Sequence, residues 1–258
     1  MLHPTALALD YRLLHVASTG STNQDALERA RAGDRGGLWI VADHQSRGRG
    51  RVGRDWSSPV GNLYATLLLR DPSEIRVAPQ LGFVAGVALA GAIEAVVGAG
   101  RGVAIKWPND ILCHGAKLAG ILVEGTSTPD GHFSAALGFG VNCTTHPTGL
   151  TYLATHLGAI VAEAVSRDAL LAALSASVVD ALALWSRGTN FAAIRRAWLA
   201  NALPQGSWLA VARPAGRQVG RFKAVDDDGR LILETDSGCM TVQAGDVFLA
   251  DHIMTAAS

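Results

Sequence analysis

Residues 45–56 form a run of alternating arginine and glycine, QSRGRGRVGRDW. Arginine presents planar forks that match phosphate and carboxylate oxygens, and glycine lets the backbone approach a ligand closely. No GK[ST] follows, so the run is not a P-loop, and its loose GxGxxG spacing precedes no clear helix. The segment alone fits two interpretations equally: a loop that wraps an anionic small molecule, or a solvated arginine-rich or nucleic-acid-binding patch. Few acidic residues lie nearby, so we expect the empty loop to be mobile.

Lysine is the rarer cation in this chain. The sequence has 19 arginines and three lysines, Lys106, Lys117 and Lys223, and two of these lie within eleven residues of each other. A lysine ammonium is a compact, titratable point charge, which a guanidinium cannot reproduce. The bias indicates that Lys106 and Lys117 do work that arginine cannot do.

Composition excludes several classes of protein. The formal net charge is zero, so the whole molecule has no field suited to nucleic acid. The three cysteines form no CxxC pair, which predicts no metal site and a reducing compartment. The N-terminus does not resemble a signal peptide. The apolar run 81–97 is shorter than the roughly 20 residues of a membrane span and contains Glu94, so it predicts a buried helix. We expect a cytoplasmic protein without membrane contact.

Hydrophobic periodicity predicts an α+β fold. Strands are expected at 11–17, 38–42, 63–69, 103–106, 110–113, 118–124 and 133–142, and helices at 22–33, 79–97, 167–186 and 190–199. After residue 206 only short strand patterns occur, with DDDGR as a hairpin turn, which is typical of a small β-barrel. We therefore expect two domains, 1–204 and 205–258.

Five ordered segments resemble the motifs of biotin protein ligases. They are STNQDA (21–26), the arginine–glycine run continuing to residue 69, KWPND (106–110), KLAGILVE (117–124) and GFGVNC (138–143). The resemblance covers residues 11–249. It implies a central mixed β-sheet with flanking helices, like the core of class II aminoacyl-tRNA synthetases and biotin–lipoate ligases, followed by a small Src-homology-type β-barrel. It also implies an ATP-dependent, AMP-forming biotin–[acetyl-CoA-carboxylase] ligase of the short form.

The resemblance also implies roles for individual residues. The residues implied to be catalytic are Lys117, Arg51 and Asp110. Those implied to bind biotin are Ser21, Thr22, Asn23, Gln45, Gly48, Arg49, Gly50, Arg51, Lys117 and Gly120. Those implied to bind ATP or the adenylate are Arg49, Arg51, Arg54, Trp56, Lys106, Asn109, Lys117 and Asn142. ATP, biotin and Mg²⁺ are the expected substrates and activating ion, and no sequence motif identifies a protein ligand for the metal.

Some roles stay open at this level. Ser21 and Thr22 fit helix capping as well as binding of the biotin ureido ring. Asp110 fits a base or orienter for the carrier lysine, or an ATP ligand, and Asn109 fits a turn residue. When ATP activates biotin, the lysine and arginine side chains must neutralise the biotin carboxylate and the α-phosphate of ATP, because these two anions repel each other.

Three alternatives compete with this interpretation. A lipoate or octanoate ligase or transferase shares the core fold, but the combination of GRGRVGRDW and KWPND favours biotin. A DNA-binding repressor would need a helix-turn-helix domain, and only 20 residues precede Ser21, so we expect no specific DNA binding. A non-catalytic biotin-binding module would not need Lys117 and Asp110. The expected partner is a biotin carboxyl carrier domain of a carboxylase, and a homodimer is possible.

Overall fold

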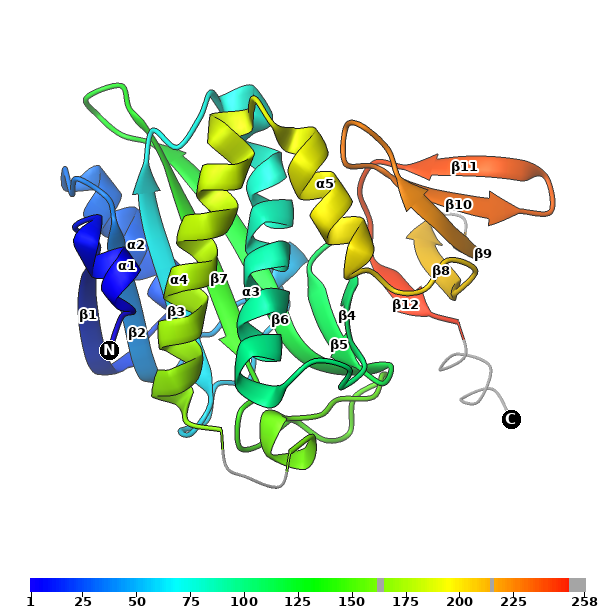
Figure 1. Cartoon of the computed structure of the whole chain (residues 1–258), viewed down its shortest axis with the longest axis horizontal. Helices are drawn as coiled ribbons and strands as arrows, with labels where there is room; N and C mark the ends of the chain where they lie inside the picture. The colour runs from blue at the N-terminus through cyan, green and yellow to red at the C-terminus, as the bar shows by residue number, and fades with distance from the viewer. Residues whose placement is uncertain (162–164, 214–215, 251–258) are drawn as a thin grey trace.

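A seven-stranded mixed sheet forms the centre of the computed structural model, which describes residues 1–161, 165–213 and 216–250 (Figure 1). The strand order is β1-β2-β3-β7-β6-β5-β4, with β1 and β2 parallel and all other neighbours antiparallel. The strands are β1 (Arg12–Thr19), β2 (Leu38–Gln45), β3 (Leu63–Arg70), β4 (Val103–Lys106), β5 (Asp110–Cys113), β6 (Ala116–Ser127) and β7 (Phe133–Val141). The mixed central sheet predicted from the sequence is confirmed.

Position in the sheet explains the composition of each strand. β3 lies between β2 and β7, is buried along all but its last residue, and reads as a continuous apolar run, LYATLLLR. β1 is an edge strand, and its residues alternate between exposed and partly buried positions.

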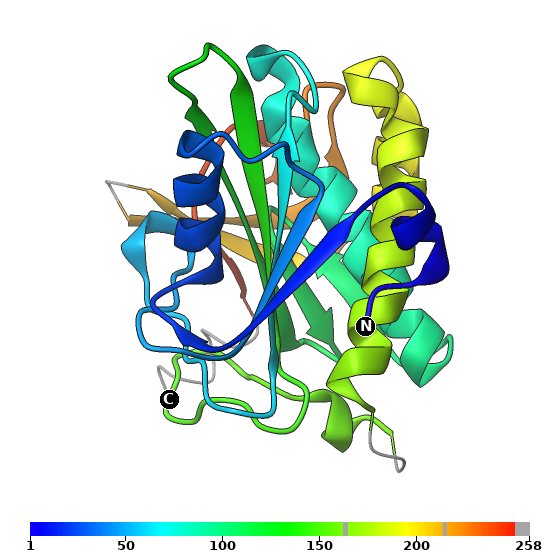
Figure 2. The same cartoon turned by 90° about the vertical axis from the view of Figure 1, so that its left-hand side faces the viewer.

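Helices cover the two faces of this sheet unequally (Figure 2). α3 (Leu81–Val97) and α4 (Arg167–Trp185) pack together on one face, with α5 (Phe191–Ala200) against both, and α2 (Thr22–Arg31) lies on the opposite face. The remaining helices are short: α1 (Pro4–Ala8), η1 (Arg51–Gly53), η2 (Ile75–Gln80), η3 (Leu157–Ala159) and η4 (Ser186–Gly188). α2 packs on β2, β3, β6 and β7. It covers only part of this face of the sheet, and the site described below lies on the remaining part.

Helix α3 is part of the core, as predicted. Two helical stretches, Ile75–Val97 and Arg167–Gly188, are long and apolar enough to cross a membrane by length and composition. In this fold their apolar windows are 61% and 39% buried, because they pack on the sheet and on each other. Burial against the sheet therefore accounts for the apolar run at 81–97.

The C-terminal strands form a second, antiparallel sheet. They are β8 (Trp208–Arg213), β9 (Gly216–Val225), β10 (Leu231–Thr235), β11 (Gly238–Val242) and β12 (Val247–Leu249), in the order β11-β10-β9-β8-β12. All five predicted strands are present, and no β11–β12 pairing closes the sheet within the described residues. Hydrogen bonds link the C-terminal strands to the end of β4. Lys106 Nζ donates to the Val247 carbonyl at 2.7 Å, and Trp107 Nε1 donates to the Gly229 carbonyl, in the turn between β9 and β10, at 3.0 Å.

The predicted element boundaries agree with the structure within a few residues. The short helices α1, η1, η3 and η4 were not among the predicted elements. α1 has a proline near its first residue, His3 as its N-cap and one buried residue, Ala6, and its five residues carry too little periodicity to be recognised.

Candidate active site

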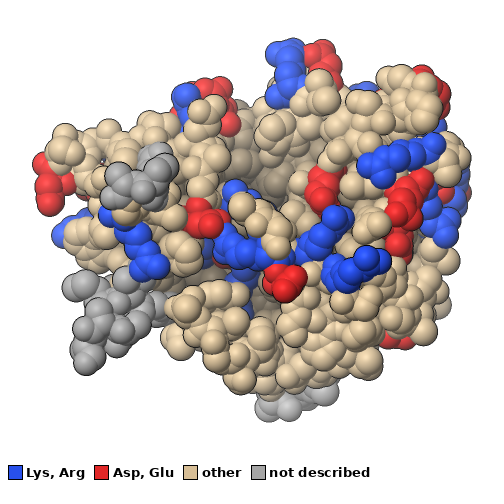
Figure 3. Space-filling model, turned by 180° about the vertical axis from the view of Figure 1, so that it is seen from behind, with Lys and Arg blue, Asp and Glu red and all other residues tan. Residues whose placement is uncertain are grey.

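A cavity of about 100 Å³ opens on the face of the sheet opposite α3 and α4. Lysine and arginine side chains gather there around a hollow, with acidic side chains beside them (Figure 3). The cavity is lined by every residue implied to act on biotin or ATP except Gly48 and Asn142, and those two line an adjoining cavity. The fold therefore brings together residues that are up to about a hundred positions apart.

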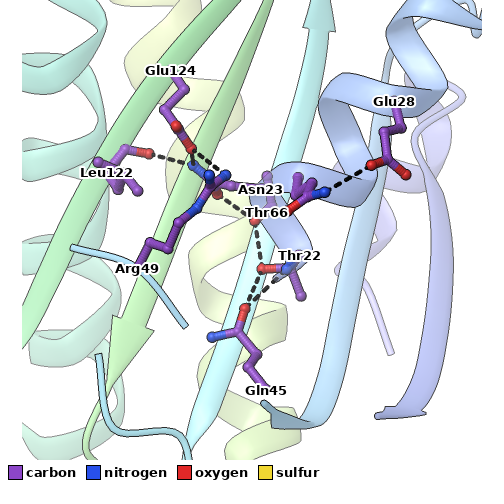
Figure 4. Close-up of polar contacts among 9 residues, drawn as sticks. Thr22, Asn23, Glu28, Gln45, Arg49, Thr66, Leu122 and Glu124 are labelled. Atoms are coloured by element: carbon purple, nitrogen blue, oxygen red, sulfur yellow. Dashed lines mark hydrogen bonds and ion pairs between the residues drawn. The ribbon is translucent and has the colours of Figure 1, made fainter. Parts of the chain in front are cut away.

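One end of the cavity, called the neutral end below, is a hydrogen-bond network of the uncharged side chains of Thr22, Asn23, Gln45 and Thr66, with the Arg49–Glu124 ion pair at its border (Figure 4). Gln45 Oε1 accepts from the Thr22 backbone N–H at 2.9 Å and lies 3.1 Å from the Thr22 hydroxyl. The buried Thr66 hydroxyl lies 2.8 Å from Thr22 Oγ1 and 2.7 Å from Asn23 Oδ1. Asn23 Nδ2 donates to the Leu122 carbonyl at 3.1 Å and to Glu124 Oε2 at 2.9 Å.

The number of N–H and O–H donors in this network determines which groups are free to bind a ligand. Both N–H donors of Asn23 are used, and its Oδ1 can only accept, so the Thr66 hydrogen is assigned to it. The Thr22 hydroxyl can then donate to either of two acceptors, Thr66 Oγ1 or Gln45 Oε1. Each of these side chains keeps another hydrogen bond when the Thr22 hydroxyl turns away, to Asn23 Oδ1 and to the Thr22 N–H respectively. Thr22 can therefore turn its hydroxyl to a ligand, whereas Asn23 cannot donate to one and instead holds its neighbours in place.

The capping alternative for Ser21 and Thr22 is wrong. Ser21 occupies the N-cap position of α2 but makes no side-chain cap bond, and the Thr22 hydroxyl contacts Gln45 and Thr66. Both side chains are almost fully buried and line the cavity.

Glycines form the floor of the cavity. Gly120 on β6 and Gly140 on β7 are direct cross-strand partners, and a Cβ on either would meet the Trp56 ring at 3.0 Å or 2.6 Å. A Cβ at Gly138, two residues along the same face, would lie 2.1 Å from Asn23 Oδ1. Trp56 Nε1 is buried on this floor without a hydrogen-bond partner. The glycines thus admit the indole ring and the Asn23 amide, which larger residues would expel.

The other end of the cavity is charged, and Asp110 is its centre. Lys117 Nζ lies 2.7 Å from Asp110 Oδ1, and Lys106 Nζ lies 2.9 Å from Oδ2. Lys117 Nζ also lies 5.4 Å from the centre of the Trp56 ring and 5.5 Å from that of Tyr152. The two lysines singled out by composition therefore converge on one carboxylate, while Lys223 is exposed and donates to Cys239 Sγ.

The surroundings of Asp110 determine its protonation state. Burial raises the pKa of this carboxyl, but the charges and hydrogen bonds of Lys106 and Lys117 outweigh burial, so its pKa lies well below the ordinary value. A carboxylate with so low a pKa is a weak proton acceptor near neutral pH. The geometry favours Asp110 as the group that positions two lysines over its role as the base for an incoming amine.

Two arginines of the 45–56 loop have acidic partners. Arg49 pairs with Glu124 at 3.5 Å, and Arg54 pairs with Asp246 on the C-terminal sheet side. Arg51 lies 3.3 Å from Asn109 Oδ1 and 3.5 Å from the Gly245 carbonyl, and burial lowers its pKa. Both carboxylates lie far from the loop in the sequence, so a search for acidic residues near the loop could not find them.

Several residues of the site were not identified from the sequence, and four of them make its polar or ionic contacts. They are Thr66, Glu124, Tyr152 and Asp246. Thr66 and Glu124 stand inside motifs that were recognised, so the motifs contained the signal. Tyr152 and Asp246 lie in loops without a motif, and only the fold places them beside Lys117 and Arg54.

Within the described ranges, no three His, Cys, Asp or Glu side chains are grouped so that they could hold a metal ion. Asp110 is already bound by two ammonium groups. The donor set therefore fits a Mg²⁺ that is carried by a triphosphate as part of the substrate, and it does not fit a resident metal.

Two family models match the chain. Residues 16–142 match the biotin/lipoate A/B protein ligase family, and residues 211–250 match the biotin protein ligase C-terminal domain. The chain is 38% identical over 240 residues to a biotin–[acetyl-CoA-carboxylase] ligase of Paracoccus denitrificans, covering 90% of this chain and 98% of that protein. It is 34% identical to the Mycobacterium tuberculosis enzyme of the same name, covering 90% and 86%.

Solved structures agree on the fold. Biotin protein ligase from Aquifex aeolicus in complex with biotin and ATP superposes with a TM-score of 0.77 at 24% identity, covering 92% of this chain and 97% of that one. At this identity the likeness concerns architecture only. The matched families, the full-length relatives and the shared architecture agree with the five motifs gathered in one cavity: this chain belongs to the biotin protein ligase family.

Proposed function

We propose that this chain is an ATP-dependent biotin protein ligase that forms biotinyl-5′-adenylate and transfers the biotin to a lysine of a biotin carboxyl carrier domain, as in an acetyl-CoA carboxylase. The observation that carries the proposal is one cavity with a neutral, hydrogen-bonding end at Thr22 and Gln45 and a cationic end at Lys117 and Arg51. Biotin has the same polarity, with an uncharged ureido ring at one end and a carboxylate at the other. Lipoate has no ureido group, so the neutral network does not favour that alternative.

The neutral end binds the ureido ring. The Thr22 hydroxyl turns to the ureido oxygen, and Gln45 Oε1 keeps the Thr22 N–H when it does so. Gln45 Nε2 donates to Ser58 Oγ at 3.0 Å, which fixes the orientation of the amide. Asn23 acts through its neighbours and is a positioning residue.

The charged end supports adenylation. The biotin carboxylate oxygen attacks the α-phosphorus of ATP, the bond to the bridging oxygen breaks, and pyrophosphate leaves. Lys117 and Arg51 neutralise the two anions as they approach, and a fixed cation at this position stabilises the negative charge that develops on the phosphoryl oxygens. Asp110 holds Lys106 and Lys117 in place before the substrates arrive.

Biotin transfer follows at the acyl carbon of biotinyl-adenylate. The carrier amine attacks this carbon, the carbon–oxygen bond to AMP breaks, AMP leaves with the electron pair, and the amine proton passes to solvent. Asp110 contributes to this step by orienting groups, since its low pKa makes it a weak base.

Trp56 occupies the floor of the empty cavity and must shift when biotin enters. With the indole in place, the cavity measures about 100 Å³, well below the roughly 300 Å³ at which ligand pockets begin. A shifted indole can cover the adenylate and place its unpartnered Nε1–H against a ligand oxygen.

The test is a mass-spectrometric assay with ATP, biotin and a carrier domain. A gain of one biotin on the carrier is expected. Modification by lipoate or octanoate alone would support the alternative enzyme class, and no modification would reject both.

Four further expectations belong to this proposal. Residues 1–204 and 205–258 act as two domains, of which residues 162–164, 214–215 and 251–258 lie outside the described residues. The enzyme works in the cytoplasm without membrane contact, a homodimer is possible, and the chain does not read DNA sequence. A sequence-selective footprint at physiological salt would contradict the last statement.

A further inference from the structure

Two half-buried histidines are bonded to each other beside the active site. His146 Nδ1 and His156 Nδ1 lie 2.8 Å apart, and the ring centres lie 5.0 Å apart with 29° between the ring planes. The distance between the centres is close to the nitrogen–nitrogen distance plus two ring radii, so the rings meet edge to edge along one N–H···N bond. This bond needs one Nδ1–H donor and one bare Nδ1 acceptor. The pair therefore keeps its bond when one ring is protonated and loses it when both are.

The two histidines close the irregular loop between β7 and η3, residues 142–156. The first limb of this loop is anchored to the sheet by Asn62, a fully buried side chain at the start of β3. Asn62 Oδ1 accepts from three successive backbone N–H groups, those of residues 143–145, at 2.8, 3.0 and 3.3 Å. His146 follows this anchored segment directly, so its ring is held at a fixed place against the sheet.

The returning limb of the loop carries Tyr152 and pairs with the backbone of Lys117. The N–H of Lys117 donates to the carbonyl of residue 153 at 2.8 Å, and its carbonyl accepts from the N–H of residue 155 at 2.9 Å. The Tyr152 ring centre lies 5.5 Å from Lys117 Nζ, and both residues line the active-site cavity and the adjoining one. The bond between the histidines therefore fastens the limb beside Lys117 to the limb held by the sheet.

No fixed negative charge favours protonation of this pair. Within the described ranges neither imidazole has a carboxylate partner. The Cys143 thiol is neutral because burial raises its pKa to about 11, and the Arg167 charge that reaches it from α4 is paired with Asp43. Burial and the neighbouring His146 lower the pKa of His156. The closed loop thus resists a proton that an open loop accepts, so closure is complete above the ordinary histidine value of about 6.5 and is lost as pH falls.

We propose that His146 and His156 are positioning residues, whose bond holds Tyr152 and the Lys117 backbone in place and breaks when both rings are protonated. The consequence for catalysis rests on the proposed function, in which Lys117 neutralises the anions of the first step. An open loop takes up about one proton more than the closed pair. The ratio of closed to open loop should therefore fall about tenfold per pH unit below about pH 6.5.

Variants of His146 separate the bond from its charge. The amide of asparagine has its nitrogen and oxygen bonded to Cγ, as Nδ1 of histidine is, so His146→Asn can donate to a neutral His156 and accept from a protonated one. Its loop should stay closed in acid. His146→Ala has no partner for His156, and its loop should be open about fivefold more often even at neutral pH, which is the worth of one hydrogen bond. His114→Asn, at an exposed histidine in the turn between β5 and β6, is the matched control and should behave as the wild type.

Two measurements read the loop and the chemistry separately. Amide hydrogen exchange of residues 144–156, corrected for the intrinsic rate at each pH, reports closure without any substrate. Biotin-dependent exchange of labelled pyrophosphate into ATP reports the first step of catalysis. The ratio of pyrophosphate exchange in His146→Asn to that in the wild type should be close to one at neutral pH and should rise below about pH 6.5. The effects of pH on the substrates cancel in this ratio.

Each measurement can fail on its own. Equal amide protection of the wild type and His146→Asn in acid would overturn the pH-sensitive bond. A pyrophosphate exchange ratio that stays close to one while the protection of the wild type falls would overturn the positioning role. Absence of pyrophosphate exchange in the wild type at neutral pH would reject the proposed function, and amide protection would still decide whether the histidine bond closes the loop.

Discussion

The two ends of the active-site cavity are organised by different physics. At the neutral end, buried side chains are joined by hydrogen bonds in which nearly every donor has one acceptor. At the charged end, Lys106 and Lys117 share one carboxylate, and Arg54 pairs with Asp246. Glu124 lies between the two ends, since it accepts from Asn23 and pairs with Arg49. An anionic substrate competes for these charged partners, whereas an uncharged ring uses only the spare hydroxyl of Thr22. The difference predicts that changes at the charged end slow chemistry, while changes at the neutral end weaken binding of biotin.

Asp110→Asn should cause the largest loss of folding stability, because it leaves two nearly buried ammonium groups at the charged end without a counterion. Removing one member of a buried ion pair costs about 3–5 kcal/mol. The stabilisation by a carboxylate with a lowered pKa is complete above its unfolded pKa, about 3.9, and is lost as pH falls through the lower folded value. Denaturant unfolding at several pH values should show a wild-type advantage that is constant above about pH 5 and shrinks in acid. A constant difference at every pH would contradict this role.

Lys117→Arg tests whether shape or charge matters at the same end. The wider, planar guanidinium cannot take the place of an ammonium that lies 2.7 Å from Asp110 and between two aromatic rings. We expect adenylation, measured as pyrophosphate release with biotin and ATP, to fall about 10²–10³-fold, or ~3–4 kcal/mol. Lys223→Arg is the matched control and should be nearly silent, since Lys223 is exposed in the C-terminal sheet. A near-normal rate for Lys117→Arg would show that charge alone suffices.

Gly140→Ala extends the comparison to the floor between the two ends. The new Cβ would lie 2.6 Å from the Trp56 ring, so the indole must move away from its position over Gly140. Overpacking of this kind costs about 1–3 kcal/mol. The biotin KM should rise, and the Trp56 contribution to fluorescence should change before ligand is added. Gly82→Ala, at a helical glycine with open space around it, should leave both unchanged. An unaltered biotin KM in Gly140→Ala would mean that the floor does not shape the ligand site.

Thr66→Val is the mildest change, and it sharpens the distinction between binding and chemistry. It keeps the shape but removes the hydroxyl that donates to Asn23 Oδ1, at a cost of about 1–2 kcal/mol. The biotin KM should rise about tenfold while kcat stays close to normal. Thr241→Val, at an exposed position in the C-terminal sheet, should be silent. A fall in kcat at constant KM would place Thr66 in the chemistry and remove the contrast between the two ends.

Local sequence accounts for most elements and for the motif residues. β3 is recognisable because its run is apolar, and α3 because a helix buried on most sides needs little polar surface. The motifs at 21–26, 45–56, 106–110, 117–124 and 138–143 supplied the residues that line the two adjoining cavities. Their lysines were also singled out by composition, without reference to any family.

What each motif residue does was decided by tertiary structure. The hydrogen-bond saturation of Asn23, on α2, depends on Thr66, Leu122 and Glu124, which lie on β3 and β6. The pairing of Arg54 with Asp246 joins positions nearly two hundred residues apart. The sequence determined which chemical groups this protein has, because residue types and spacing are local properties. Only the fold decided which donor meets which acceptor and which charge is already neutralised, because those depend on distances between segments far apart in the chain.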